Sequence, residues 1–266
     1  MEVSLPCQPL SNRFYEINRG PPPVVPMNEA RLSKKSAYRT HQCVYCALRP
    51  ATVVEHIFAK KFFVLERRAD LPTAPACEEC NTKKSKLEMY LMSVMPFGCE
   101  NIDGPDALAA AEPRLAKNPR LHRELIDGHS VRLGFRNGKI APVMMTVPIE
   151  PDKVLQFFEY AAKGLMFWHW KASLQLKHKC KAHFLSGEGE LRLNKLLSLK
   201  RTTRVNVNLG EGTYAYEGVQ SQDAPELTVW KFQMMGSASL EVRPGLELRY
   251  VGVLTGSGKL VDSFIG

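Results

Sequence analysis

Two short stretches decide the fold of the first part of the chain: CVYC at residues 43–46 and CEECNTKKSK at residues 77–86. Each contains a C-x2-C pair, and two thiolates at this spacing can bind one metal ion from a tight turn. Two such pairs complete a closed four-sulfur site, for which zinc is the usual metal. The spacing therefore predicts a structural zinc ion bound by four cysteines: Cys43, Cys46, Cys77 and Cys80.

The other cysteines do not suggest a disulfide framework. The chain has seven cysteines in 266 residues, which is an odd number, and its N-terminus lacks the basic and apolar regions of a secretory signal. We therefore expect Cys7, Cys99 and Cys180 to be unpaired thiols and the protein to be cytoplasmic. No stretch approaches the roughly 18 apolar residues of a membrane helix, so no membrane partner is expected.

The positive charge is concentrated around the cysteines. The whole chain carries 36 basic and 27 acidic residues, a net charge of +9, and residues 31–86 hold 12 of the basic and 5 of the acidic residues, a net charge of +7. A local excess of this kind indicates a surface that binds a polyanion such as nucleic acid. The alternative is a solvated basic face without a partner.

The pattern of residues divides the chain into three parts. Residues 1–30, which contain GPPPVVP, are predicted to form an irregular extension. A short helix is expected at 28–36. The cysteine module spans 31–98, with a strand at 52–59 and a helix at 81–95. Residues 99–266 form the third part.

The third part predicts helices followed by strands. A helical stretch at 103–127 is interrupted by two prolines, and a hairpin at 130–149 turns at Asn137-Gly138. A long helix at 151–176 is apolar nearly all round and therefore buried, with Trp168, His169 and Trp170 in the core rather than stacked on bases. Further strands are expected at 228–235, 240–244, 246–254 and 259–265. The fold class is α+β with a mostly antiparallel sheet.

The polar residues near the cysteines resemble a known family. Glu55 and His56 form an acid–histidine pair between the two C-x2-C pairs, and Asn81 directly follows the fourth cysteine in CEECN. This pattern, over residues 41–90, resembles the HNH or ββα-metal endonucleases. It is closest to the branch with a four-cysteine zinc site and Asn as the last motif residue, which includes phage junction-resolving endonucleases.

The resemblance implies a site for phosphodiester hydrolysis. His56 would be the general base that activates water, and Glu55 and Asn81 would bind a catalytic magnesium or manganese ion. Zinc would hold the strand that carries His56 against the helix that begins near Asn81. The residues expected to contact nucleic acid are Lys60, Lys61, Lys83, Lys84 and Lys86.

Two positions depart from the family pattern. Glu55 stands where Asp is usual, and the middle Asn is not evident, although Asp70 lies near its usual place. The resemblance predicts a metal-dependent DNA endonuclease, from phage, mobile-element or anti-phage defence biology. RNA stays open as a substrate, and a homodimer would be one way to cut both strands. The alternatives are a non-catalytic zinc-stabilised nucleic-acid-binding protein and a protein-interaction scaffold.

Overall fold

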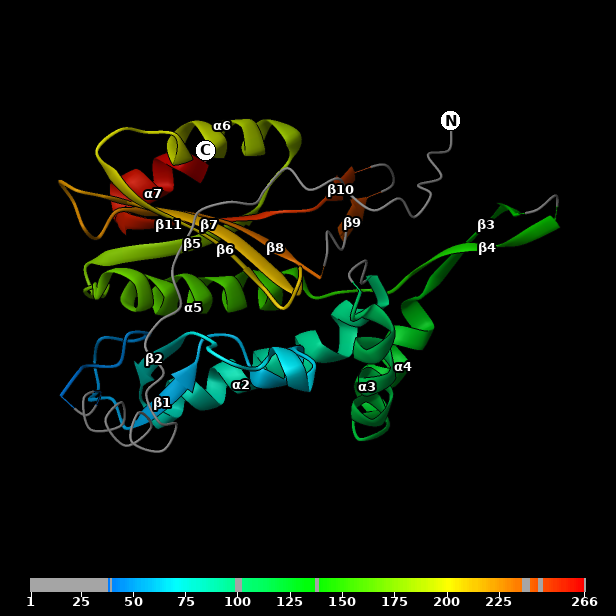
Figure 1. Ribbon diagram of the computed structural model, residues 1–266. Helices are drawn as coiled ribbons and strands as arrows, with labels where there is room; N and C mark the ends of the chain where they lie inside the picture. Colours follow the sequence, from blue (N-terminus) through cyan, green and yellow to red (C-terminus); the bar gives the residue numbers. More distant parts are fainter. Residues whose placement is uncertain are drawn as a thin grey trace.

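The computed structural model describes residues 38, 40–98, 102–136, 139–235, 240–243 and 246–265. Within these, only the backbone is described for residues 98, 130–136, 139–146, 240–243, 246–248 and 264–265. The expected extension at 1–30, the helix at 28–36, Cys7 and Cys99 lie outside the described residues. The fold is α+β with a mostly antiparallel sheet, as predicted (Figure 1).

The largest sheet has five strands in the order β5-β11-β8-β7-β6, and every neighbouring pair is antiparallel. Helices α6 and α7 cover one face of this sheet, and α5 covers the other (Figure 1). The strands are β5 (His178–Phe184), β6 (Thr202–Leu209), β7 (Tyr214–Ser221), β8 (Thr228–Met234) and β11 (Val251–Ser257). The helices are α5 (Pro151–Trp170), α6 (Gly187–Leu197) and α7 (Gly258–Ile265).

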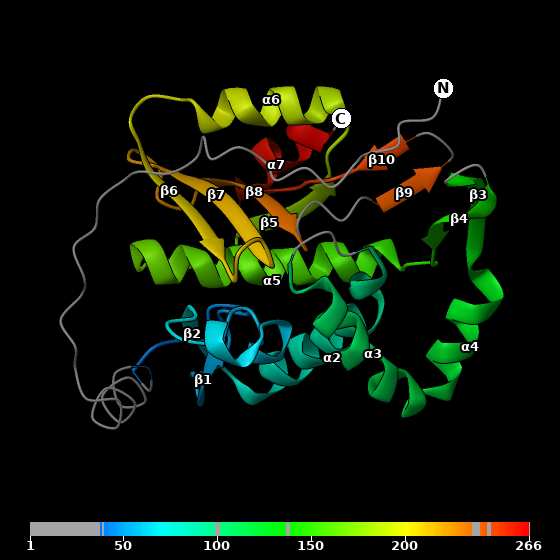
Figure 2. The same cartoon turned by 45° about the vertical axis from the view of Figure 1, so that its right-hand side comes forward.

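The cysteine region forms a second layer on the far side of α5 (Figures 1 and 2). Strands β1 (Val53–His56) and β2 (Thr73–Ala76) pair in antiparallel register, with Glu55 opposite Ala74 and His56 opposite Thr73. Helix α2 (Glu78–Val94) follows β2 directly, so the order along the chain is β-β-α. Two short 3-10 turns, Lys60–Phe62 and Leu65–Arg67, lie between the strands.

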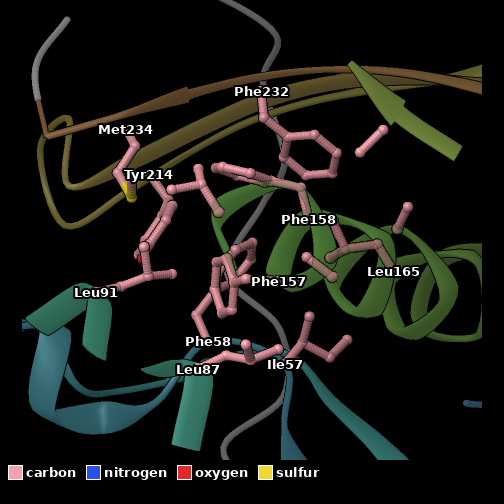
Figure 3. Close-up of a cluster of buried hydrophobic side chains, with 14 of the residues drawn as sticks. Ile57, Phe58, Leu87, Leu91, Phe157, Phe158, Leu165, Tyr214, Phe232 and Met234 are labelled. Carbon is pink, nitrogen blue, oxygen red and sulfur yellow. The ribbon is translucent and has the colours of Figure 1, made fainter. Parts of the chain in front are cut away.

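Helix α5 is buried, as its apolar circumference predicts, and it joins both layers into one hydrophobic core. Phe157 and Phe158 are buried between Phe58 on one side and Phe232 on the other (Figure 3). The backbone of α5 approaches the β1 layer closely at Gly164, where an added Cβ would lie 2.8 Å from Ile57 Cγ1. The cysteine region therefore packs on the rest of the chain through a shared core.

Further elements extend from the end of α2. After a 3-10 turn at Met95–Gly98, helix α3 (Gly104–Ala116) lies beside α2, and α4 (Pro119–Gly128) packs on α3 (Figure 2). The strands of the predicted hairpin pair as β3 (Ser130–Arg136) and β4 (Lys139–Thr146), and the turn expected at Asn137-Gly138 lies outside the described residues. A second two-stranded sheet pairs β9 (Leu240–Arg243) with β10 (Leu246–Leu248).

Several predicted elements are wrong or incomplete. Residues 259–265 were expected as a strand but form α7, and the strand expected at 246–254 is divided between β10 and β11. Helix α5 ends at Trp170 rather than at 176, because Lys171 adopts a left-handed conformation with φ 54°. No helix or strand was predicted between residues 176 and 228, where the chain forms β5, α6, β6 and β7.

Candidate metal centre and nucleic-acid site

The four predicted zinc ligands come together. The sulfur atoms of Cys43, Cys46, Cys77 and Cys80 all lie within 4.8 Å of one another, and this is the one such group of potential metal ligands among the described residues. The Sγ atoms of Cys46 and Cys77 are 3.9 Å apart. A zinc–sulfur bond of about 2.3 Å gives a tetrahedron with edges of about 3.8 Å. The cluster therefore has the size that a tetrahedral metal ion needs.

Local backbone contacts shape the first cysteine pair. Ala47 N–H donates to the carbonyl of Cys43 at 2.8 Å, and Ala47 adopts a left-handed φ of 52°, which turns the chain tightly. Val44 N–H donates to the carbonyl of Pro75 at 3.1 Å, which fixes this turn on β2 beside the second pair. The second pair lies at the start of α2, where Asn81 N–H donates to the carbonyl of Cys77.

The electrostatics of the cluster favour a bound cation. Burial raises the pKa of the Cys43 thiol and of the Cys80 thiol, and neighbouring cysteines add to the effect at Cys80. Burial also acts on Cys46, but backbone N–H groups of Leu48 and Arg49 stabilise its thiolate and lower its pKa to about 7. Adjacent buried thiolates repel one another, so a divalent cation is what makes four of them stable together.

A buried ion cluster links α2 to the end of β1. The ammonium group of Lys84, whose side chain is 0% exposed, donates to Glu55 Oε1 at 2.8 Å and also to Glu88 Oε1. It donates a third hydrogen bond to the backbone carbonyl of His56 at 2.9 Å. All three hydrogens of the ammonium group thus have acceptors. Lys84 therefore holds the end of β1 against the second turn of α2.

This arrangement corrects the prediction for Lys84. We expected Lys84 to contact nucleic acid, but its side chain is inaccessible and its charge is balanced by two carboxylates. Burial raises the pKa of Glu88 to about 7, an effect that Lys84 partly offsets. Glu88 was not among the predicted site residues, although its i,i+4 spacing from Lys84 is a usual signal for an ion pair on a helix.

The candidate catalytic residues lie around this cluster. Glu55 is buried, whereas His56 and Asn81 are half-buried. Asn81 lies one helical turn before Lys84, which contacts both Glu55 and His56, so the three predicted residues border one region. Their catalytic roles stay predictions. Asp70, near the expected place of the middle Asn, is exposed and has a left-handed φ of 55°.

The remaining predicted basic contacts are more accessible. Lys61, Lys83 and Lys86 are exposed, and Lys60 is half-buried. Lys83 forms an ion pair of 2.7 Å with Glu79. Solvent reaches all four of these lysines, so their role as nucleic-acid contacts stays a prediction.

The Trp168, His169 and Trp170 segment packs inward, as predicted. Trp170 lies 5.0 Å from Trp230 between ring centroids, and Trp230 is fully buried. His169 Nε2 is 3.0 Å from the hydroxyl oxygen of Tyr216. The segment therefore belongs to the border of the core between α5 and the sheet.

Comparison with protein-family models, curated proteins and solved structures gives no match. We therefore infer function from the residues of the site. Among the described residues, none of the helices combines the length and apolar character needed to cross a bilayer.

Proposed function

We propose that this chain is a metal-dependent endonuclease of the HNH type, which hydrolyses DNA phosphodiester bonds and binds one structural zinc ion. The observation that supports the proposal is the joining of two features. The four-cysteine cluster holds the β1–β2 hairpin next to the start of α2. The bonds of Lys84 to Glu55 and to the carbonyl of His56 then bring the acid–histidine pair close to the helix turn that carries Asn81.

His56 is the general base in this proposal. An imidazole can accept a proton near neutral pH, which suits the activation of water for attack on phosphorus. The side chain of His56 is half-buried and its Nδ1 is inaccessible, so we assign the role of proton acceptor to Nε2. Lys84 positions His56 through the backbone, because its hydrogen bond to the His56 carbonyl restrains the end of β1.

Glu55 and Asn81 offer oxygen ligands for a catalytic cation. Lys84 bonds Oε1 of Glu55, so we assign Oε2 and the side-chain oxygen of Asn81 to the cation. Two protein oxygens completed by water suit magnesium. When bound, magnesium or manganese would stabilise the negative charge that develops on the phosphate and the leaving oxygen.

One observation favours the alternative, a non-catalytic zinc-stabilised nucleic-acid-binding protein. Lys84 already balances the charge of Glu55, and Glu55 is buried, which weakens the attraction of this carboxylate for a cation. In this alternative the ion cluster is a structural link between β1 and α2, and only the basic surface acts on nucleic acid.

The test is cleavage of supercoiled plasmid with added magnesium or manganese. Wild type, His56→Ala and His122→Ala would be compared at matched zinc content, since His122 is an exposed histidine on α4 outside the site. We expect nicked or linear DNA from wild type and His122→Ala, and none from His56→Ala. Equal cleavage by His56→Ala would refute His56 as the base. The alternative would be supported if zinc-loaded wild type binds DNA but does not cut plasmid, branched or single-stranded DNA.

A further inference from the structure

A groove of about 720 Å³ runs along the exposed face of α2. One side is α2 itself, and the other is built from the end of α3, the start of α4 and the start of α5. Figure 2 shows α3 beside α2 on this side of the molecule. The α2 residues that line the groove are Thr82, Ser85, Lys86, Met89, Tyr90 and Ser93.

The groove begins next to the proposed catalytic site. Successive helix residues are separated by about 100° around the axis, so Asn81 lies between Ser85, which lines the groove, and Lys84 and Glu88 on the buried face. Lys84 meets β1 on that buried face. A strand that contacts Asn81 could therefore enter the groove beside Ser85.

The groove carries positive charge that the protein does not balance. Four cations line it, of which Arg120 pairs with Glu124 and Lys153 pairs with Glu150. Within the part of the chain that the structure describes, no carboxylate forms an ion pair with either of the other two, Lys86 and Arg114.

Arg114 is the more constrained of these two cations. It is half-buried, its Nη1 donates to the carbonyl of Met92 at 3.1 Å, and burial lowers its pKa. The bond to Met92 fixes the guanidinium against the end of α2. An anion in the groove would relieve the unfavourable burial of this charge, and a guanidinium binds phosphate well.

We propose that this groove binds the phosphodiester backbone of a single nucleic-acid strand, through Lys86 and Arg114, as that strand leaves the catalytic site. The inference rests on the proposed nuclease function and names the form of its substrate. The volume is that of a pocket for a small ligand, for which about 300–1,000 Å³ is usual, so it accommodates a short piece of one strand rather than a duplex. Met89, which is 47% exposed, offers an apolar surface to an unstacked base.

The test is binding of a short fluorescein-labelled DNA single strand and of a duplex of the same sequence, followed by anisotropy at several salt concentrations without added divalent cation. The variant combines Lys86→Gln with Arg114→Gln. The logarithm of the binding constant falls linearly with the logarithm of the salt concentration, and each phosphate contact on a single strand adds about 0.7 to the steepness of this line. The loss of two contacts should therefore reduce the steepness by about 1.4. At about 0.1 M salt it should weaken single-strand binding about 25-fold. Duplex affinity should change much less.

A matched control removes the same charge elsewhere. Lys195 and Lys200 are exposed, at and just after the end of α6 on the other side of the sheet, and the Lys195→Gln, Lys200→Gln variant should bind as wild type does. If the Lys86→Gln, Arg114→Gln variant does not fold, the single substitution Lys86→Glu replaces it in the binding test, because Lys86 is an exposed side chain on α2. Single-strand binding unchanged by these substitutions would overturn the proposal, and so would an equal loss for the duplex.

Hydrolysis of bis(p-nitrophenyl) phosphate separates this inference from the proposed function. This diester is too small to reach along the groove, so its hydrolysis by wild type reports on the catalytic site alone. Absence of hydrolysis and of DNA cleavage by wild type, with single-strand binding that depends on Lys86 and Arg114, would refute the nuclease proposal and leave the groove standing.

Discussion

Replacing Lys84 by Met removes the cation from the buried cluster while keeping a side chain of similar length. Glu55 and Glu88, whose side chains are 9% and 5% exposed, then lose their partner, and the carbonyl of His56 loses a hydrogen bond of 2.9 Å. Removing one member of a buried ion pair typically costs about 3–5 kcal/mol. We therefore expect the free energy of unfolding of Lys84→Met to fall by about that amount.

The measurement is urea unfolding at neutral pH, followed by tryptophan fluorescence and circular dichroism at matched zinc content. Lys83→Met is the control, since Lys83 is exposed and pairs only with Glu79 at the surface, where an ion pair contributes at most about 1 kcal/mol. A double-mutant cycle with Glu88→Gln should show a coupling of about 1 kcal/mol or more, because Lys84 and Glu88 contact each other in one buried cluster. A loss below about 1 kcal/mol for Lys84→Met would refute the buried cluster as a link between β1 and α2.

Three further predictions concern the metal, the core and pH. Cys77→Ser should lose zinc by metal analysis and unfold at lower temperature, whereas Cys180→Ser, at a buried cysteine outside the cluster, should keep one zinc per chain. Gly164→Ala should destabilise the protein by about 1–3 kcal/mol, because the added Cβ would meet the buried Ile57 side chain. Gly187→Ala is the control, since its Cβ would meet nothing within 4 Å, and it should change stability little. Equal stability of the two variants would contradict the close packing of α5 on the β1 layer. The stability of wild type should fall as pH rises from 4.5 through about 7, because folded Glu88 retains a proton that the unfolded chain releases in this window, and Glu88→Gln should lack this dependence.

Some of the errors in the sequence reading had a visible cause. In α7, Leu260, Val261, Phe264 and Ile265 recur at helical spacing, and the segment was assigned the period of a strand. In β6 the alternation of Val205, Val207 and Leu209 with polar residues is a strand pattern, which the high polarity of the segment obscured. Both elements could have been predicted from residue spacing alone.

The burial of Lys84 could not be predicted in this way. Lys83, Lys84 and Lys86 are chemically alike and close in sequence, but they point in different directions around α2. Only Lys84 faces β1, where Glu55 and Glu88 balance its charge, while Lys83 and Lys86 face solvent. The groove depends on tertiary structure too, because Arg114 and Lys153 come from α3 and α5, distant in sequence from α2.

Local pattern was enough to predict the four-cysteine cluster, the β3–β4 hairpin and the burial of α5, because each follows from short-range spacing, turn residues or apolar periodicity. It was not enough to predict which basic side chains are buried, where the unbalanced charge of the groove lies and how α5 joins both layers. Those features depend on which faces of α2 and α5 meet residues that are remote in the chain, and local pattern carries no information about such contacts.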